Sequence, residues 1–265
     1  MSEQLPEAVS GEDESVHRSR AIYILPNLFT SAALFCGFYA IVQAMNDRFD
    51  LAAVAIFIAM VLDGLDGRVA RLTNTQSAFG AEYDSLSDMV AFGVAPALVI
   101  YEWSMKDLGK LGWMAAFLYC VCAALRLARF NTNIAVVDKR YFQGLPSPAA
   151  AALVTGFIWI MIDNGETGLD HLLGIPVPYL AWFFAVFAGL SMVSNVLFWS
   201  GKSINLRRAV PFSVALAFIA VLLAVHYDPP VMLFLLFVTY AMSGYVMSLW
   251  RVLRRYRAQR GARPS

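Results

Sequence analysis

The chain has 265 residues, of which 59% are apolar and only 15% carry a charge, and its mean hydropathy is +0.61. Soluble globular domains carry about 25% charged residues, and one compact core of this size cannot hide so much apolar surface from water. The composition therefore excludes an ordinary soluble protein and indicates an integral membrane protein. The formal net charge of +1 also excludes a nucleic-acid-binding protein that depends on overall positive charge.

The first 22 residues are polar and acidic and lack the apolar stretch of a signal peptide, so we expect a disordered tail there. After this tail, apolar runs long enough to cross about 30 Å of hydrocarbon as helices recur to the end of the chain. The eight predicted spans are residues 24–45, 49–72, 81–103, 112–130, 148–163, 178–199, 209–226 and 230–250. The predicted fold class is therefore an all-α polytopic membrane protein.

Four regions follow from this pattern. They are the disordered tail (1–22), a membrane domain of six helices (23–200), a C-terminal helix pair (201–250) and a basic tail (251–265). Of the 20 Lys and Arg residues, seventeen fall on the side of the membrane that holds both termini, and only Arg48, Lys106 and Lys110 fall on the other side. Because cytoplasmic loops accumulate positive charge, we predict that both termini are cytoplasmic.

Four aspartates lie within or beside the second and third predicted spans, where an uncompensated charge costs several kcal/mol. They are Asp63, Asp66, Asp84 and Asp88. In each span the two aspartates are three or four residues apart, so they share one helix face. With about eight residues between the spans, we expect the two helices to be antiparallel neighbours whose acidic faces meet in the inner third of the bilayer.

Four converging carboxylates would repel one another unless cations lay between them. Oxygen ligands without histidine or cysteine favour Mg²⁺ or Mn²⁺, and four carboxylates suit a site for two divalent cations. A divalent-cation transporter is an alternative interpretation of the same acids. Transporters, however, favour sites at the midplane, broken helices and internal repeats, whereas this sequence has one acidic cluster near one face.

The acids belong to a longer pattern with fixed gaps. It runs Asp63-x-x-Asp66-Gly67-x-x-Ala70-Arg71, then eight residues, then Gly80-x-x-x-Asp84-x-x-x-Asp88. This pattern resembles the complete signature of the CDP-alcohol phosphotransferase family. The segments PNLFTSAALFCGF, ALRLARFNTN and YFQGLPSPAAA are similar to the phosphatidylserine synthase branch of that family in bacteria and archaea.

The resemblance implies an enzyme that transfers the phosphatidyl group of CDP-diacylglycerol to an alcohol and releases CMP. In the resembled branch the alcohol is L-serine; glycerol phosphate or an inositol phosphate is the alternative acceptor within the family. The resemblance further implies a bacterial inner-membrane protein with its active site facing the cytoplasm, surrounded by membrane lipids and forming a homodimer.

The resemblance also implies roles for the motif residues. Asp63, Asp66 and Asp84 would hold the two divalent cations, and Asp88 would complete the cluster and act as general base. The residues expected at the CDP-diacylglycerol site are Asn27, Asp63, Asp66, Gly67, Ala70, Arg71, Gly80 and Asp84. For Asn27, at the start of the first span, capping of the helix is an alternative role.

The carboxylate or phosphate of the acceptor needs residues that bind it, and cationic side chains suit that role. The candidates near the inner end of the fourth span and before the fifth are Arg126, Arg129, Lys139, Arg140 and Ser147. The alternative is that these cations only flank the spans on the cytoplasmic side.

Overall fold

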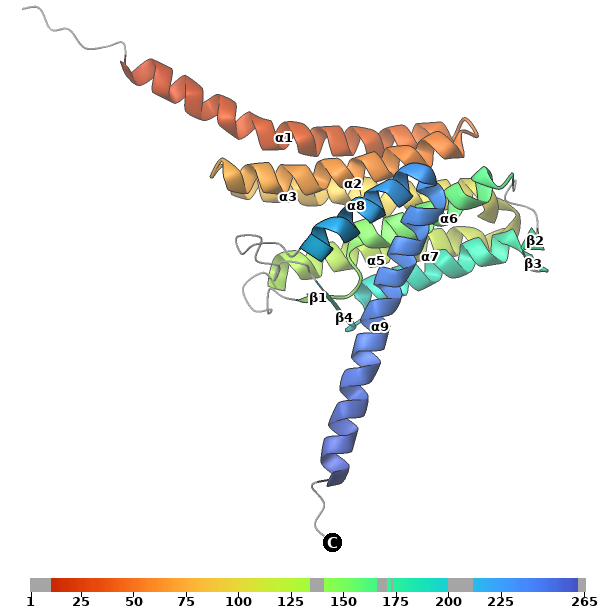
Figure 1. Ribbon diagram of the computed structural model, residues 1–265. Helices are drawn as coiled ribbons and strands as arrows, with labels where there is room; N and C mark the ends of the chain where they lie inside the picture. The colour runs from red at the N-terminus through yellow and green to blue at the C-terminus, as the bar shows by residue number, and fades with distance from the viewer. Residues whose placement is uncertain (1–10, 134–140, 166–170, 173, 200–211, 262–265) are drawn as a thin grey trace, which may run out of the picture.

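The computed structural model describes residues 11–133, 141–165, 171–172, 174–199 and 212–261. These residues are almost entirely helical, as predicted (Figure 1). The α-helices are α1 (Gly11–Ala44), α2 (Phe49–Leu72), α3 (Ala78–Asp88), α4 (Ala95–Ile100), α5 (Lys110–Asn133), α6 (Ser147–Asp163), α7 (Val177–Val193), α8 (Phe212–Tyr227) and α9 (Pro229–Gly261).

Short elements join or extend these helices. The π-helical turn η1 (Met89–Val94) connects α3 and α4 into one rod, and a second π-helical turn, η2 (Tyr101–Met105), and a 3₁₀ turn, η3 (Lys106–Leu108), extend that rod beyond α4. Two antiparallel strand pairs complete the described elements: β1 (Tyr141–Gln143) with β4 (Leu197–Trp199), and β2 (His171–Leu172) with β3 (Ile175–Pro176).

Each predicted span overlaps one helical stretch, and several ends differ; α9, for example, continues to Gly261 rather than ending at residue 250. The first helix begins at Gly11, inside the segment expected to be a disordered tail. The sixth span was predicted to run to residue 199, but α7 ends at Val193 and residues 197–199 form β4. Ser194 takes an extended conformation there, with φ −64° and ψ 161°.

The third span is interrupted by a π turn that has an identifiable cause. Pro96 lacks the amide hydrogen that an α-helix would direct to the carbonyl of Phe92. The hydroxyl of buried Tyr119, on α5, donates to that carbonyl instead, at 3.0 Å. The carbonyl of Phe92 is therefore hydrogen-bonded despite the irregular turn. The same bond connects this rod to α5 one helical turn after Asp88.

Within the part of the chain that the structure describes, four stretches are long and apolar enough to cross a membrane: Leu25–Ala44, Ala78–Leu108, Lys110–Thr132 and Pro229–Arg251. The helices α6 and α7 are apolar but shorter, at 17 residues each. These helices indicate a membrane protein. Eight crossings and the cytoplasmic location of both termini stay predictions.

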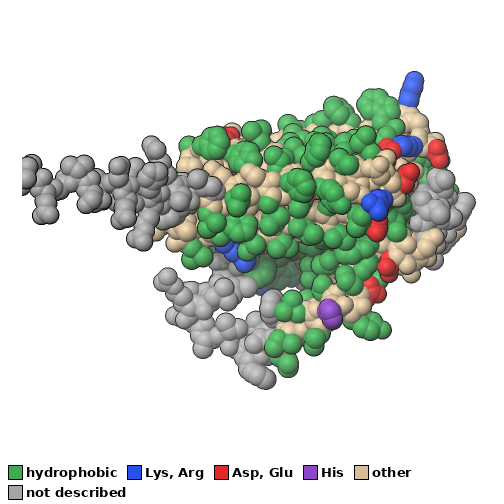
Figure 2. All heavy atoms as spheres, turned by 90° about the horizontal axis from the view of Figure 1, so that it is seen from above, with side chains coloured by type: hydrophobic (Ala, Val, Ile, Leu, Met, Phe, Trp, Pro, Cys, Tyr) green, Lys and Arg blue, Asp and Glu red, His purple; other side chains and the backbone are tan. Residues whose placement is uncertain are grey.

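The helices pack through small residues and turn their large apolar side chains outward. In Figure 1, α1 lies along α2, with α5, α6 and α7 on the other side of the bundle and α9 crossing them obliquely. The core is rich in alanine, for example Ala40, Ala52 and Ala150, each 0% exposed. Figure 2 shows hydrophobic side chains covering most of the visible face of the described residues. Small residues inside and large apolar residues outside are the arrangement expected of helices packed in lipid.

Candidate active site

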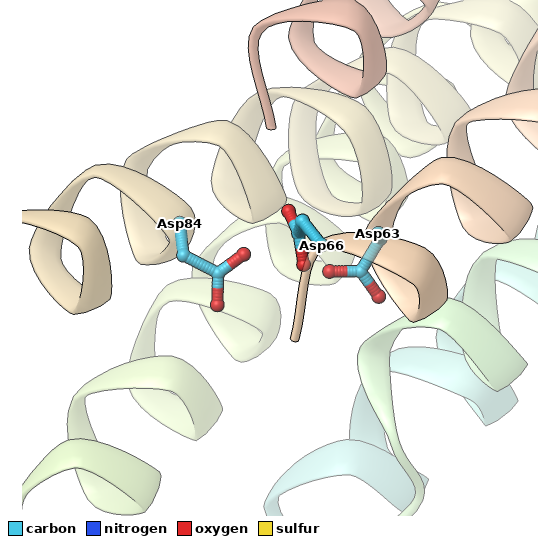
Figure 3. Close-up of side chains that lie close together, drawn as sticks. All are labelled: Asp63, Asp66 and Asp84. Carbon is cyan, nitrogen blue, oxygen red and sulfur yellow. The ribbon is translucent and has the colours of Figure 1, made fainter. Parts of the chain in front are cut away.

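Three of the predicted aspartates form one cluster. Asp63 and Asp66 on α2 and Asp84 on α3 each offer a carboxylate oxygen, and these oxygens lie within 4.8 Å of one another. Figure 3 shows the three carboxylates directed toward a shared space between the two helices. Such a set of hard oxygen donors, with no histidine or cysteine among its described members, fits a divalent cation of the Mg²⁺ or Mn²⁺ type.

The local sequence explains why α2 and α3 face each other here. Asn74, with φ +54°, reverses the chain after α2, and Asn is one of the residues that tolerates this conformation. Ser77 then caps α3 by accepting a hydrogen bond from the Gly80 amide at 3.0 Å. The turn brings Asp84 back beside Asp66, and α1 packs against both α2 and α3.

Asp66 is held by a residue outside the acidic motif. The Thr30 hydroxyl, on α1, donates to Oδ2 of Asp66 at 2.6 Å, and both side chains are buried. Ser87, on α3, donates to the Thr30 carbonyl at 3.0 Å. Three helices are thus joined at one metal-ligand candidate. The sequence analysis missed Thr30, although a hydroxyl within an apolar span was a visible signal.

Asp88 lies beside this cluster rather than within the group of three. Its carboxyl shares a hydrogen bond with Asp63, and it interacts electrostatically with the guanidinium of Arg126. Two carboxyl groups lie this close only when a proton or a cation offsets their repulsion. The four predicted aspartates therefore form one connected group. Asp63 and Asp88 in this group interact electrostatically with Arg126 on α5.

A pocket of about 250 Å³ opens next to the cluster, between α1, α2 and α3. The residues predicted for CDP-diacylglycerol that line it are Asn27, Asp66, Gly67, Ala70, Arg71, Gly80 and Asp84; Asp63 is not among them. A Cβ on Gly67 would meet nothing within 4 Å, so this glycine leaves the pocket open. The polar residues of the lining that the sequence analysis did not select are Thr30, Thr75, Gln76 and Ser77.

The candidates for the acceptor site fall into three groups. Arg126 is buried and donates a hydrogen bond to the side chain of Ser147, on the side of the bundle that holds Asp88. Arg129 instead directs its guanidinium at main-chain carbonyls of the Gln143 turn and the end of α7. Lys139 and Arg140 lie outside the described residues.

Comparison with known proteins agrees with this geometry. The model of the CDP-alcohol phosphatidyltransferase family matches residues 23–187, a stretch that begins within α1 and ends within α7. The CDP-diacylglycerol–serine O-phosphatidyltransferase of Helicobacter pylori is 41% identical over 184 residues, which cover 69% of this chain and 75% of the relative.

Two further relatives carry the same name. The protein from Mycobacterium tuberculosis is 42% identical over 151 residues, covering 55% of this chain and 52% of its own length. The protein from Saccharomyces cerevisiae is 36% identical over 187 residues, covering 62% and 65%.

Proposed function

This chain belongs to the CDP-alcohol phosphatidyltransferase family and is a phosphotransferase of phospholipid synthesis, and from that premise we propose that its acceptor is L-serine. The reaction joins the serine hydroxyl to the phosphatidyl group of CDP-diacylglycerol and releases CMP. The observation that carries the proposal is the position of the carboxylate cluster at the wall of a pocket lined by the family motif. The names of the three relatives support serine.

The proposed cation ligands are Asp63, Asp66 and Asp84, with Asp88 completing a site for two ions, Mg²⁺ or Mn²⁺. Divalent cations bound there would neutralise the pyrophosphate and polarise the phosphorus under attack. The carboxylates of the chain fix where positive charge is held, and Thr30 fixes the orientation of one of them.

The nucleotide end of the donor is proposed to occupy the pocket between α1, α2 and α3. Arg71, which is exposed at the last turn of α2 and lines the pocket, can meet a phosphate oxygen. Asn27, Ala70 and Gly80 shape the remaining wall. A site at the inner face of a bacterial cytoplasmic membrane would leave the two acyl chains in lipid while serine enters from the cytoplasm.

Asp88 is the proposed general base. As the serine oxygen bonds to phosphorus, its proton passes to the Asp88 carboxylate, and the bond from phosphorus to the CMP oxygen breaks. Arg126, which donates a hydrogen bond to Ser147 and interacts electrostatically with Asp88, is the proposed partner of the serine carboxylate. Lys139 and Arg140 stay candidates for the same anion from the sequence alone.

A panel of acceptors tests the proposal. Purified protein with Mg²⁺ or Mn²⁺ and CDP-diacylglycerol is offered labelled serine, glycerol phosphate and inositol phosphate in turn. We expect CMP release and a labelled lipid with serine. Release that requires glycerol phosphate would overturn the choice of acceptor, and divalent-cation flux into proteoliposomes without any CMP would favour the transporter.

The homodimer is proposed from the resemblance and is measured by the mass of the protein in detergent.

A further inference from the structure

Arg129, on α5, is surrounded by backbone oxygens. Its Nη1 donates to the carbonyl of Val193 at 3.1 Å. Its Nη2 is directed at three more carbonyls, those of Gln143 at 2.8 Å, Met192 at 3.1 Å and Ser194 at 3.3 Å. Carbonyls at the end of a helix lack partners in that helix and carry partial negative charge. The guanidinium therefore satisfies the C-terminal end of α7 and has little donor capacity left for a ligand.

The same guanidinium holds the turn that precedes α6. The Gly144 amide donates to the carbonyl of Val196 at 2.8 Å, and the Leu145 amide donates to the carbonyl of Ser191 at 2.9 Å. Gly144 has φ +80°, and a Cβ there would lie 2.1 Å from the Met192 oxygen and 2.7 Å from Nη2 of Arg129. Only glycine fits this position, so the turn is built to lie directly on Arg129.

The turn leads straight to the proposed acceptor site. Ser147, two residues after Leu145, begins α6 and is 0% exposed. Its side chain accepts a hydrogen bond from Arg126, one helical turn before Arg129, and Arg126 interacts electrostatically with Asp88. A continuous set of contacts thus runs from the end of α7 through Arg129 and the turn to Arg126.

We propose that Arg129 is a positioning residue: it binds the end of α7 and residues 143–145 into one unit that holds Ser147 against Arg126 and so fixes the position of the Arg126 guanidinium. This role replaces the direct contact with an anion that the sequence favours for Arg129. It also gives α7 a task, because the carbonyls at its end anchor the turn. The kinetic consequence of this inference rests on the proposed function.

Two variants test the role from opposite sides of the contact. Arg129→Lys keeps the charge but cannot reach four carbonyls with one ammonium group. Gly144→Ala leaves every proposed ligand in place and disturbs only the close contact between the turn and the guanidinium of Arg129. Gly165→Ala is the matched control, because Gly165 also has φ +80° while a Cβ there would meet nothing within 4 Å.

The first measurement is amide hydrogen exchange of residues 143–147 in detergent-solubilised full-length protein, and it needs no turnover. We expect faster exchange in Arg129→Lys and Gly144→Ala and unchanged exchange in Gly165→Ala. Unchanged exchange in Arg129→Lys would overturn the proposal.

The second measurement separates positioning from direct binding by steady-state kinetics. Both Arg129→Lys and Gly144→Ala should raise the KM for serine by about tenfold and change the KM for CDP-diacylglycerol by less than about twofold, since the turn acts on Arg126 alone. A serine KM raised in Arg129→Lys but not in Gly144→Ala would make Arg129 a direct ligand and overturn the proposal. If the wild type does not use serine at all, the proposed function fails, and the exchange experiment still decides the role of Arg129.

Discussion

Asp66 shows how a carboxylate can be prepared for a cation by a neighbour from another helix. Thr30 occupies one of its two oxygens with a hydrogen bond of 2.6 Å. Partners of this kind fix the orientation of a ligand and contribute to metal affinity. The side chain of Thr30 is 4% exposed, so water cannot easily replace it.

We therefore expect Thr30→Val, which keeps the shape and removes the hydroxyl, to weaken Mn²⁺ binding by about tenfold. Titration of the purified protein with Mn²⁺, followed by electron paramagnetic resonance of the free ion, measures this affinity. Thr155→Val is the control, because the buried Thr155 hydroxyl bonds only the Ala151 carbonyl in its own helix. Equal affinities for the two variants would show that Thr30 does not support the metal site.

Substitution of Asp88 should mainly lower the rate of turnover, whereas substitution of Asp84 should mainly weaken binding of the metal and the donor. A general base acts mainly in the transition state, so Asp88→Asn should lower kcat by about 10²-fold to 10⁴-fold while CDP-diacylglycerol binding changes little. Asp84→Asn, within the cluster of three, should weaken Mn²⁺ binding and donor binding together. Rates of CMP release and equilibrium binding of the donor separate these effects. Equal losses of both in Asp88→Asn would make Asp88 chiefly a metal ligand.

Arg126 should affect the acceptor more than the donor. In Arg126→Gln the cation proposed to bind the serine carboxylate is lost, and we expect the KM for serine to rise by at least about tenfold with a smaller change for CDP-diacylglycerol. Initial rates over a matrix of both substrate concentrations provide the two constants. An unchanged KM for serine would leave Arg126 with a purely structural role toward Ser147.

Sequence spacing predicted that Asp63, Asp66 and Asp84 lie together, as they do, but it did not predict which residues from other helices contact them. The aspartates and glycines of the motif are separated by intervals that place them on one helix face, so their convergence follows from helix geometry. Thr30 meets Asp66 across 36 residues, and Arg129 meets the end of α7 across more than 60 residues. Such contacts depend on how distant helices pack, which no local pattern encodes.

At the scale of elements, the approach of α1 to the rod that carries Asp84 and Asp88 depends on one glycine. A Cβ on Gly37, in α1, would lie 2.6 Å from Cα of Ala91, in η1. Closely packed helices in lipid rely on such small residues. This contact lies two turns from Thr30 along the same helix, so it helps set the distance between α1 and the acidic cluster.

Gly37→Ala should accordingly separate the two elements and lower the free energy of unfolding by about 1–3 kcal/mol, the usual cost of overpacking. The midpoint of thermal unfolding in detergent checks this expectation. Gly64→Ala serves as the control, since a Cβ there would meet nothing within 4 Å and alanine favours the helix. A midpoint that falls no further for Gly37→Ala than for Gly64→Ala would contradict the tight contact.

The positions of the elements were predicted better than their internal form. Apolar length located the apolar part of each described helical stretch, because spanning segments must satisfy their backbone hydrogen bonds internally, but not the polar beginning of α1 or the basic end of α9. The π turn at Met89–Val94 was not predicted, although Pro96 was visible. Its stability depends on the Tyr119 hydroxyl from α5, and only the packed structure supplies that partner.

For the whole molecule, the family match ends where α7 is nearly complete, and α8 and α9 lie beyond it. Even so, α9 packs against the region that supports the acceptor site. A Cβ on Gly244, in α9, would lie 2.3 Å from the ring of Phe198, in β4, and the hydroxyls of Tyr245 and Ser191 are hydrogen-bonded at 2.6 Å. The C-terminal helix thus braces the end of α7 and the strand pair that adjoins the Arg129 turn.

The central claim is that carboxylates from α2 and α3 hold divalent cations at the wall of the motif pocket. Anomalous X-ray scattering from crystals of the full-length protein grown with Mn²⁺ tests it most directly. The account predicts an anomalous peak bonded to Asp63, Asp66 and Asp84. Manganese bound elsewhere, with these three carboxylates turned away from one another, would contradict it.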